Sequence, residues 1–224
     1  MSVQQNLHDI RKNIPSGCTL IAVSKTQPPE KILEAYQAGQ RVFGENRAQE
    51  LASKAKELPA DIEWHMIGHL QTNKVKYIAP VVSLIHSVDS PKLLEEIDRQ
   101  AQKVKRVIPC LLQVHIAEED TKFGFSPEEI VSFIDSNDWI KLANIEVRGL
   151  MGMATFTDDE AQLRREFRTL KSLYDRLKAR SLPDRVSMRE LSMGMSGDYK
   201  LAIEEGSTMV RIGTAIFGER LAKH

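Results

Sequence analysis

Short runs of apolar residues alternate along this chain with longer stretches in which apolar positions recur every three or four residues. A short continuous apolar run indicates a buried strand, whereas the longer spacing indicates one face of a helix. We therefore expect strands at residues 20–23, 41–43, 62–67, 82–86, 106–115, 145–149, 190–193 and 209–212. Helices are expected at residues 1–15, 29–38, 46–58, 72–79, 91–103, 127–136, 158–180 and 198–205, with a short one after Gly218.

Each of the eight expected strands is followed by a helix or a helical turn. Strands that alternate with helices form βαβ units, in which neighbouring strands run parallel. Eight such units predict an α/β fold, the closed (β/α)8 TIM barrel, which usually has about 250 residues. A doubly wound open sheet is the alternative. The chain contains no linker rich in Pro, Gly or Ser, so we expect a single domain over residues 1–224 that begins with a helix.

The last two units of this pattern carry small residues at the end of each strand. Ser196 and Gly197 follow the seventh expected strand, and Gly213 and Thr214 follow the eighth. Turns between a strand and a helix leave backbone N–H groups free to bind an anion. In a barrel, phosphates often bind after the seventh and eighth strands. The sequence therefore predicts that these two turns hold one phosphate group of a ligand.

Lys25 directly follows the first apolar run, LIAV, at the mouth of the expected barrel. A partly desolvated lysine loses its proton more readily, and the neutral amine can form a Schiff base with an aldehyde. Together with the phosphate turns, this points to pyridoxal 5′-phosphate (PLP), which carries an aldehyde and a phosphate on one ring. The alternative is an ordinary lysine whose ammonium reaches solvent at the end of a strand.

Composition narrows the class of partner. The chain has 31 Lys and Arg and 31 Asp and Glu, so neither nucleic acid nor an acidic membrane surface is an expected partner. No apolar run has the length of a transmembrane helix, and the N-terminus has no apolar signal core. Two free buried thiols are favoured over a disulfide for Cys18 and Cys110. We expect a cytoplasmic protein.

Six segments resemble, in order and at compatible spacings, the YggS/PROSC family of PLP-binding proteins: LIAVSKTQP, VFGENRAQE, WHMIGHLQTNK, HSVDS, GLMGMAT and LSMGMSGDYKLAIEEGSTMVRIGTAIFG. The resemblance implies a fold-type III barrel similar to the N-terminal domain of alanine racemase. It also implies that PLP is bound as an aldimine on Lys25. The phosphate-binding turns of the family match Ser196 with Gly197, and Gly213 with Thr214.

Arg211 lies two residues before Gly213, on the same face of its strand. By similarity to fold-type III enzymes, it should face the pyridine nitrogen or the phosphate of PLP. A salt bridge with Glu45 or Glu219 is the alternative. An arginine does not readily protonate the pyridine nitrogen, so the ring would be a weaker electron sink than it is beside a carboxylate.

Two further residues are candidates for contact with the cofactor. Asn46 contacts the ring oxygen, orders the lysine loop or caps the next helix. Met193 packs either on the face of the ring, as Met153 could, or in the core. No metal site is expected from His65 and His69, because they do not share a helix face and no carboxylate or cysteine accompanies them.

Racemases of fold-type III take a second acid–base group from a separate C-terminal domain, and this chain stops soon after its eighth expected strand. We therefore expect that the extra β-domain is absent, that the cofactor is open to solvent and that the protein is a monomer. No tyrosine has an obvious place as the second acid or base.

The expected function is that of a carrier in intracellular PLP (vitamin B6) homeostasis, without dedicated catalytic residues. Other B6 vitamers and client PLP apoenzymes are further possible partners. The alternatives are a small amino-acid racemase that uses Lys25 as one base, and a barrel that binds a sugar phosphate without a Schiff base.

Overall fold

The strands form a closed parallel barrel in a computed structural model that describes residues 2–118 and 123–218. They are β1 (Thr19–Val23), β2 (Val42–Glu45), β3 (Glu63–Met66), β4 (Val82–Val88), β5 (Ile108–His115), β6 (Ile145–Met153), β7 (Val186–Met195) and β8 (Met209–Ile212). Each strand pairs with the next, and β1 also pairs with β8 in the register Ile21↔Arg211, which closes the ring. The predicted barrel is therefore confirmed, and the open sheet is excluded.

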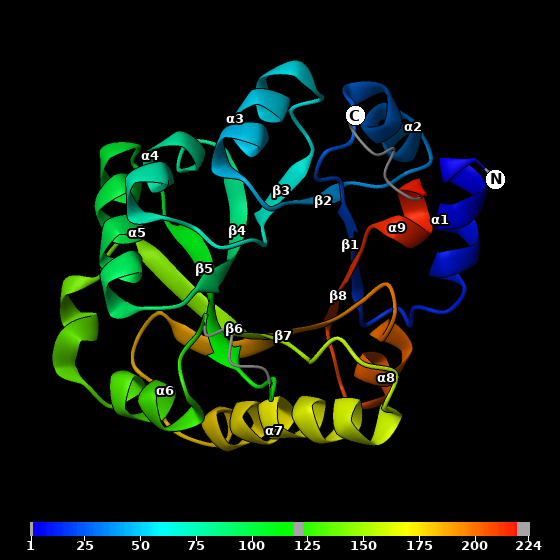
Figure 1. Cartoon of the computed structure of the whole chain (residues 1–224). Coiled ribbons are helices and arrows are strands. Elements are labelled where there is room, and N and C mark those ends of the chain that lie inside the picture. Colours follow the sequence, from blue (N-terminus) through cyan, green and yellow to red (C-terminus); the bar gives the residue numbers. More distant parts are fainter. Residues whose placement is uncertain (1, 119–122, 219–224) are drawn as a thin grey trace.

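Helices surround the ring of strands (Figure 1). They are α1 (Val3–Arg11), α2 (Pro29–Gln37), α3 (Ala48–Glu57), the 3-10 helix η1 (Thr72–Lys74), α4 (Val75–Ile78), α5 (Pro91–Lys103), α6 (Pro127–Ile134), the 3-10 helix η2 (Asn137–Lys141), α7 (Glu160–Lys178), α8 (Tyr199–Glu204) and α9 (Thr214–Phe217). The N-terminal helix α1 packs against α2 and α9, so it covers the side of the barrel where β8 meets β1 (Figure 1).

Local sequence explains where several helices begin. Pro91 and Pro127 occupy the first turns of α5 and α6, directly after Ser90 and Ser126. Each serine hydroxyl accepts a backbone N–H of the first turn, and proline suits this position because its fixed φ is already helical. These two helices therefore begin where the sequence predicts.

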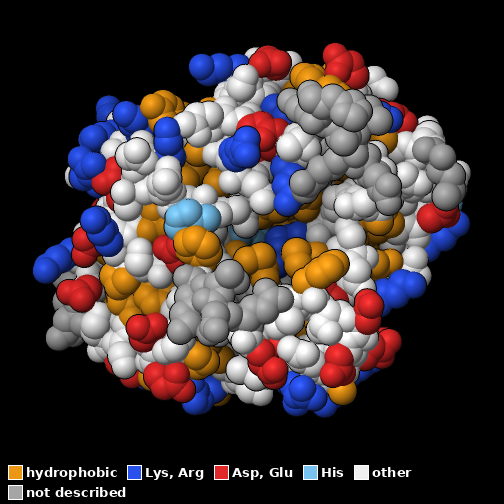
Figure 2. Space-filling view, viewed as in Figure 1, with side chains coloured by type: hydrophobic (Ala, Val, Ile, Leu, Met, Phe, Trp, Pro, Cys, Tyr) orange, Lys and Arg blue, Asp and Glu red, His pale blue; other side chains and the backbone are white. Residues whose placement is uncertain are grey.

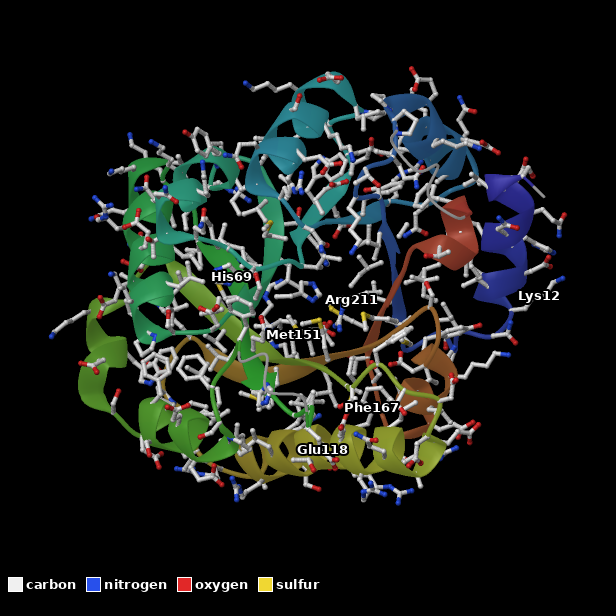
Figure 3. All side chains as sticks on the ribbon, in the orientation of Figure 1. Lys12, His69, Glu118, Met151, Phe167 and Arg211 are labelled. Carbon is white, nitrogen blue, oxygen red and sulfur yellow. The ribbon has the colours of Figure 1, made fainter. Side chains whose placement is uncertain are left out.

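Buried side chains form two layers, because successive residues of a strand point to opposite faces. The cluster inside the barrel consists of Ile21, Leu84, Leu111, Met151 and Met209. A larger cluster, which includes Phe43, Phe167 and Met193, fills the space between strands and helices. Figure 3 shows Met151 within the ring of strands and Phe167 on the barrel side of α7.

The structure differs from the sequence expectation mainly near glycines. β6 and β7 continue to Met153 and Met195, past the residues at which we expected them to end. Glycines disfavour strands in isolation, but here parallel pairing to β5 keeps Gly152 extended, in register with Val114. α9 directly follows β8, where no helix was expected, and the tail helix expected after Gly218 lies outside the described residues.

Both cysteines are free thiols buried in the core. Burial raises the pKa of Cys18 to about 11 and raises that of Cys110 as well. Within the part of the chain that the structure describes, no helix combines the length and the hydropathy that crossing a membrane requires.

Candidate functional site

A cavity of about 470 Å³ opens at the carboxyl ends of the strands, within the size range of small-molecule sites. Figure 2 shows this face hollowed at its centre, with basic side chains inside the hollow and hydrophobic ones around it. The lining residues are Val23, Lys25, Asn46, Ile67, Met153, Thr155, Phe156, Thr157, Asp158, Met195, Ser196, Gly197, Asp198, Arg211, Gly213 and Thr214. The fold thus brings residues from the first and last βα units into one site, at the face where barrels carry their function.

The two small-residue turns after β7 and β8 are joined to each other. The backbone N–H of Gly213 donates to the hydroxyl of Ser196 over 3.2 Å. Among the described residues, the N–H groups of Ser196 and Gly197 have no protein acceptor. Uncommitted N–H groups in a tight turn attract an anion. The geometry of these turns is therefore that of an anion cradle.

Asp198 shapes the first of these turns. Its carboxylate accepts the N–H of Met195 over 2.5 Å, and its own N–H donates to the carbonyl of Met195 over 3.1 Å. Burial raises the pKa of Asp198, although the positive charge of Arg211 acts in the opposite direction. The side chain therefore serves as an internal brace of the turn.

Two glycines, one near the end of β7 and one in the turn after it, have different roles. A Cβ on Gly197 would have no protein atom within 4 Å, so this position borders open space in the cavity. Gly194 has a φ of +96°, and a Cβ there would lie 2.6 Å from the Cβ of Ala202. Glycine adopts positive φ at little cost. Gly194 thus lets β7 turn tightly into α8, while Gly197 leaves room beside the free N–H groups.

Lys25 lies in the turn that follows β1. The N–H of Gln27 donates to the carbonyl of Ser24 over 3.0 Å, which makes Lys25 the second residue of a β-turn. Lys25 lines the same cavity as the cradle. The carboxyl ends of the first and last strands lie close together here, because a Cβ on Gly213 would lie 3.2 Å from the Cβ of Val23.

The guanidinium of Arg211 lies within the ring of strands and borders the cavity (Figure 3). It donates from Nη1 to the hydroxyl of Ser192 over 2.5 Å and from Nη2 to the carbonyl of Gly152 over 3.0 Å. The side chain is only 4% exposed. Burial lowers the pKa of Arg211 to about 10, so it still carries its charge at neutral pH.

The salt bridge considered for Arg211 is not formed with Glu45. That carboxylate pairs with Lys54 instead, over 2.8 Å, and Glu219 lies outside the described residues. Within the described ranges, Arg211 makes no ion pair. Its positive charge is therefore available to a ligand in the cavity.

A buried chain of hydrogen bonds continues from Arg211 across the barrel. His86 Nδ1 lies 2.9 Å from Ser192 Oγ, and His86 Nε2 lies 3.0 Å from His65 Nδ1. Desolvation lowers the pKa of His65 to about 3 and that of His86 well below its usual value, so both rings are neutral. One assignment satisfies all three hydrogen bonds: Arg211 donates to Ser192, Ser192 to His86, and His86 to His65. This hydrogen-bond network orients the Arg211 guanidinium without placing a negative charge beside it.

The structure separates the two remaining sequence candidates. Asn46 lines the cavity, whereas the N-cap position of α3 is Arg47, which makes no side-chain cap bond. Met193 is fully buried between barrel and helices, because Ser192 before it points into the barrel. Met193 therefore occupies the core position that was its alternative, and the cavity is lined by Met153 and Met195 instead.

His65 and His69 have separate partners. His65 bonds to His86 inside the barrel, and Nδ1 of His69 lies 3.1 Å from the carboxylate of Asp89 nearer the surface. Across residues 2–118 and 123–218, no three His, Cys, Asp or Glu side chains come together in a way that could hold a metal ion.

Part of the cavity wall was missed from the sequence. Phe156, Thr157 and Asp158 line the cavity from the loop after β6. Glu166 of α7 anchors this loop, since its carboxylate accepts the N–H and the hydroxyl of Thr155 over 2.7 Å each. The segment ending at Thr155 could be recognised as a strand end, but the residues beyond it carry no motif.

Known proteins resemble the chain over nearly its whole length. Residues 1–221 match the family described as alanine racemase, N-terminal domain. The pyridoxal phosphate homeostasis protein of Aquifex aeolicus is 45% identical over 202 residues, which cover 90% of this chain and 86% of that protein. PipY of Synechococcus elongatus, solved with PLP bound, is 36% identical with a TM-score of 0.86, covering 97% of this chain and 100% of that one.

Alanine racemase of E. faecalis shares the fold at greater distance. Its TM-score is 0.72 at 16% identity, and the alignment covers 97% of this chain but 58% of the racemase. The barrel thus corresponds to a part of that enzyme.

Proposed function

Since this chain belongs to the alanine racemase N-terminal domain family and is closely similar to pyridoxal phosphate homeostasis proteins, we propose that it binds PLP and acts in PLP homeostasis. One observation carries the proposal: the anion cradle, Lys25 and Arg211 border a single cavity. PLP is the cofactor that offers a phosphate, an aldehyde and a ring nitrogen to three such groups.

The cradle fits the phosphate. Gly197 leaves open space where a side chain would otherwise stand, and the N–H groups of Ser196 and Gly197 face no protein acceptor in the described chain. The Ser196 hydroxyl joins the cradle to Gly213. We assign phosphate binding to Ser196, Gly197, Gly213 and Thr214.

The opposite end of the ligand fits Lys25. A neutral lysine amine condenses with an aldehyde so that a C=N bond forms and one water molecule leaves. We propose that Lys25 holds PLP through this Schiff base, with Asn46 beside the ring oxygen. The bond is reversible by hydrolysis, which suits a protein that takes up and releases the cofactor.

Arg211, and the lack of a tyrosine among the described residues that line the cavity, favour a carrier over a racemase. An always-charged guanidinium at the pyridine nitrogen does not give up a proton to it, so the ring draws electrons weakly. No tyrosine is found among the described residues that line the cavity. A racemase needs a second acid–base group within hydrogen-bond reach of the substrate. We therefore propose binding without dedicated turnover.

We further propose that the protein acts as a cytoplasmic monomer with one domain over residues 1–224. Other B6 vitamers with a phosphate would share the cradle, and client apoenzymes would receive PLP at the open face of the barrel. Light scattering of the loaded protein measures the oligomeric state directly. Transfer to an apoenzyme is measured as recovered activity of that enzyme after mixing.

The central experiment traps the bond to Lys25. Borohydride reduction of the PLP-loaded protein should leave the mass of reduced PLP on a peptide that contains Lys25, and Lys25→Ala should abolish both this mass and the visible imine band. Lys56→Ala, on the exposed side of α3, is the matched control and should retain both. Label on other lysines, with none on Lys25, would contradict the proposal.

A panel of amino acids, each as both enantiomers, separates the carrier from the racemase. The carrier proposal expects no racemisation or elimination above the rate of free PLP. Turnover that is lost in Lys25→Ala would support the racemase instead.

A further inference from the structure

The residue after Lys25 has a strained backbone. Thr26 has a φ of +64°, in the left-handed region that a β-branched residue rarely adopts. It is the third residue of the turn 24–27, where a type II turn requires positive φ. Strain of this kind persists only where surrounding contacts enforce it. The contacts that hold Thr26 therefore also set the direction of Lys25.

Two charged side chains of α3 make those contacts. Glu50 Oε1 accepts the N–H of Thr26 over 2.7 Å, and Lys54 Nζ donates to the carbonyl of Ser24 over 2.8 Å. Lys54 Nζ also lies 2.6 Å from Glu50 Oε1. The peptide groups on both sides of Lys25 are thus bound to one ion pair.

Glu45 completes this buried cluster behind β1 and β2. Its Oε1 lies 2.8 Å from Lys54 Nζ and accepts the hydroxyl of Ser24 over 2.5 Å. Glu45 is 0% exposed and Lys54 is 6% exposed. Oε2 of Glu45 has no partner among the described residues. Buried ion groups contribute little net stability compared with apolar residues, so fold stability alone does not account for this cluster.

We propose that Lys54, with Glu45 and Glu50, is a positioning group that fixes the Lys25 amine for condensation with the aldehyde of PLP. Lys25 borders the cavity, whereas none of the three cluster residues does. Lys54 therefore acts through the backbone of the turn and does not touch the ligand. This inference rests on the proposed function, since it explains how the amine reaches the aldehyde.

Two ligands distinguish positioning from a general effect on the pocket. Pyridoxamine 5′-phosphate has the ring and phosphate of PLP but carries an amine in place of the aldehyde, so it cannot condense with Lys25. In Lys54→Met, PLP affinity and the imine absorbance should fall at least about tenfold, because misplacement of a reacting group by about an ångström costs that much or more. Pyridoxamine 5′-phosphate affinity should stay within about twofold, and the exposed control Lys56→Met should change neither.

A rescue experiment tests the role of strain. Glu50→Ala removes the acceptor of the Thr26 N–H and should weaken PLP binding about tenfold. Adding Thr26→Gly to Glu50→Ala removes the side chain that disfavours positive φ. The double variant should recover PLP affinity to within about threefold of the parent chain.

Three results would overturn the inference: equal losses of both ligands in Lys54→Met, no loss of either, or no recovery on adding Thr26→Gly to Glu50→Ala. Failure of the proposed function is distinct, because then the parent chain itself would not form the borohydride-trapped bond at Lys25.

Discussion

Single residues in this site have clearly different tasks, and neighbouring glycines show it best. Gly197 borders open space in the cavity, whereas a Cβ on Gly194, three residues earlier, would clash with the Cβ of Ala202. Gly197 therefore leaves room for the ligand, whereas Gly194 is needed for the fold. Arg211 is a similar case, because it contributes a buried charge to the cavity and relies on Ser192 for its orientation.

Gly197→Ala is predicted to leave folding unchanged and to weaken ligand binding. The new methyl group meets no protein atom within 4 Å, so the free energy of unfolding should move by less than about 0.5 kcal/mol. The methyl group enters the space assigned to the phosphate, and overpacking of about 1–3 kcal/mol corresponds to roughly a fivefold to 150-fold rise in Kd. Urea unfolding and a PLP titration measure the two effects. Unaltered PLP affinity would contradict the phosphate assignment.

At the scale of elements, the carboxyl end of β7 determines the site. The strand carries Ser192 into the barrel, then turns at Gly194 and Asp198 to begin α8. Its register against β8 shifts between Ser192 and Met195. This irregularity allows one strand to supply both a partner of Arg211 and the first turn of the cradle.

Gly194→Ala is predicted to destabilise the protein itself. The φ of +96° disfavours any side chain, and the Cβ would lie 2.6 Å from that of Ala202. Together these effects should lower the free energy of unfolding by about 2–4 kcal/mol. Thermal unfolding without ligand measures the change. A loss below that of Gly197→Ala would contradict this account of the turn.

For the whole molecule, the barrel interior is polar near its mouth and apolar deeper inside. The chain from Arg211 to His65 links β8, β7, β4 and β3. Both histidines are held neutral by burial. Such a network makes stability depend on pH, because the unfolded chain exposes the same rings to water.

Folding stability should fall as the pH falls below about 6.5, the ordinary histidine value. The pKa of His65 is about 3 in the folded chain, so between these values only the unfolded chain binds the proton. From pH 7.5 to pH 5, His65 should account for a loss of about 2 kcal/mol. Urea unfolding of the parent chain and of His65→Gln at both pH values measures this contribution as the difference between their pH slopes.

Glu45 changes the folding stability with pH in the opposite direction to His65. Burial raises its pKa to about 7, so its contribution is largest at low pH and is lost as the pH rises through that value. Glu45 is present both in the parent chain and in His65→Gln, so its contribution cancels when their pH slopes are compared. His8→Gln, at an exposed position of α1, is the control that should keep the parent slope. An equal slope in His65→Gln would contradict the neutral, buried state of His65.

The sequence by itself determined the alternation of strands and helices, the small residues of the cradle and the position of Lys25 at a strand end. These features depend on neighbours within one βα unit, where hydrophobic period and turn chemistry are local properties. Asn46 and Arg211 were also recognised, Asn46 directly after a strand and Arg211 within one, and the role of Arg211 came from the similarity to fold-type III enzymes. Each of these residues borders the cavity in the folded chain.

Only the tertiary structure decided which side chains face one another. Met193 points outward and Met195 reaches the cavity, because closure of the barrel and the shift in β7 set the inward face. The pairing of His65 with His86, and of Lys54 with the turn at Lys25, joins residues 21 and 30 positions apart. Contacts of that range depend on strand register and helix placement, which no short segment of sequence specifies.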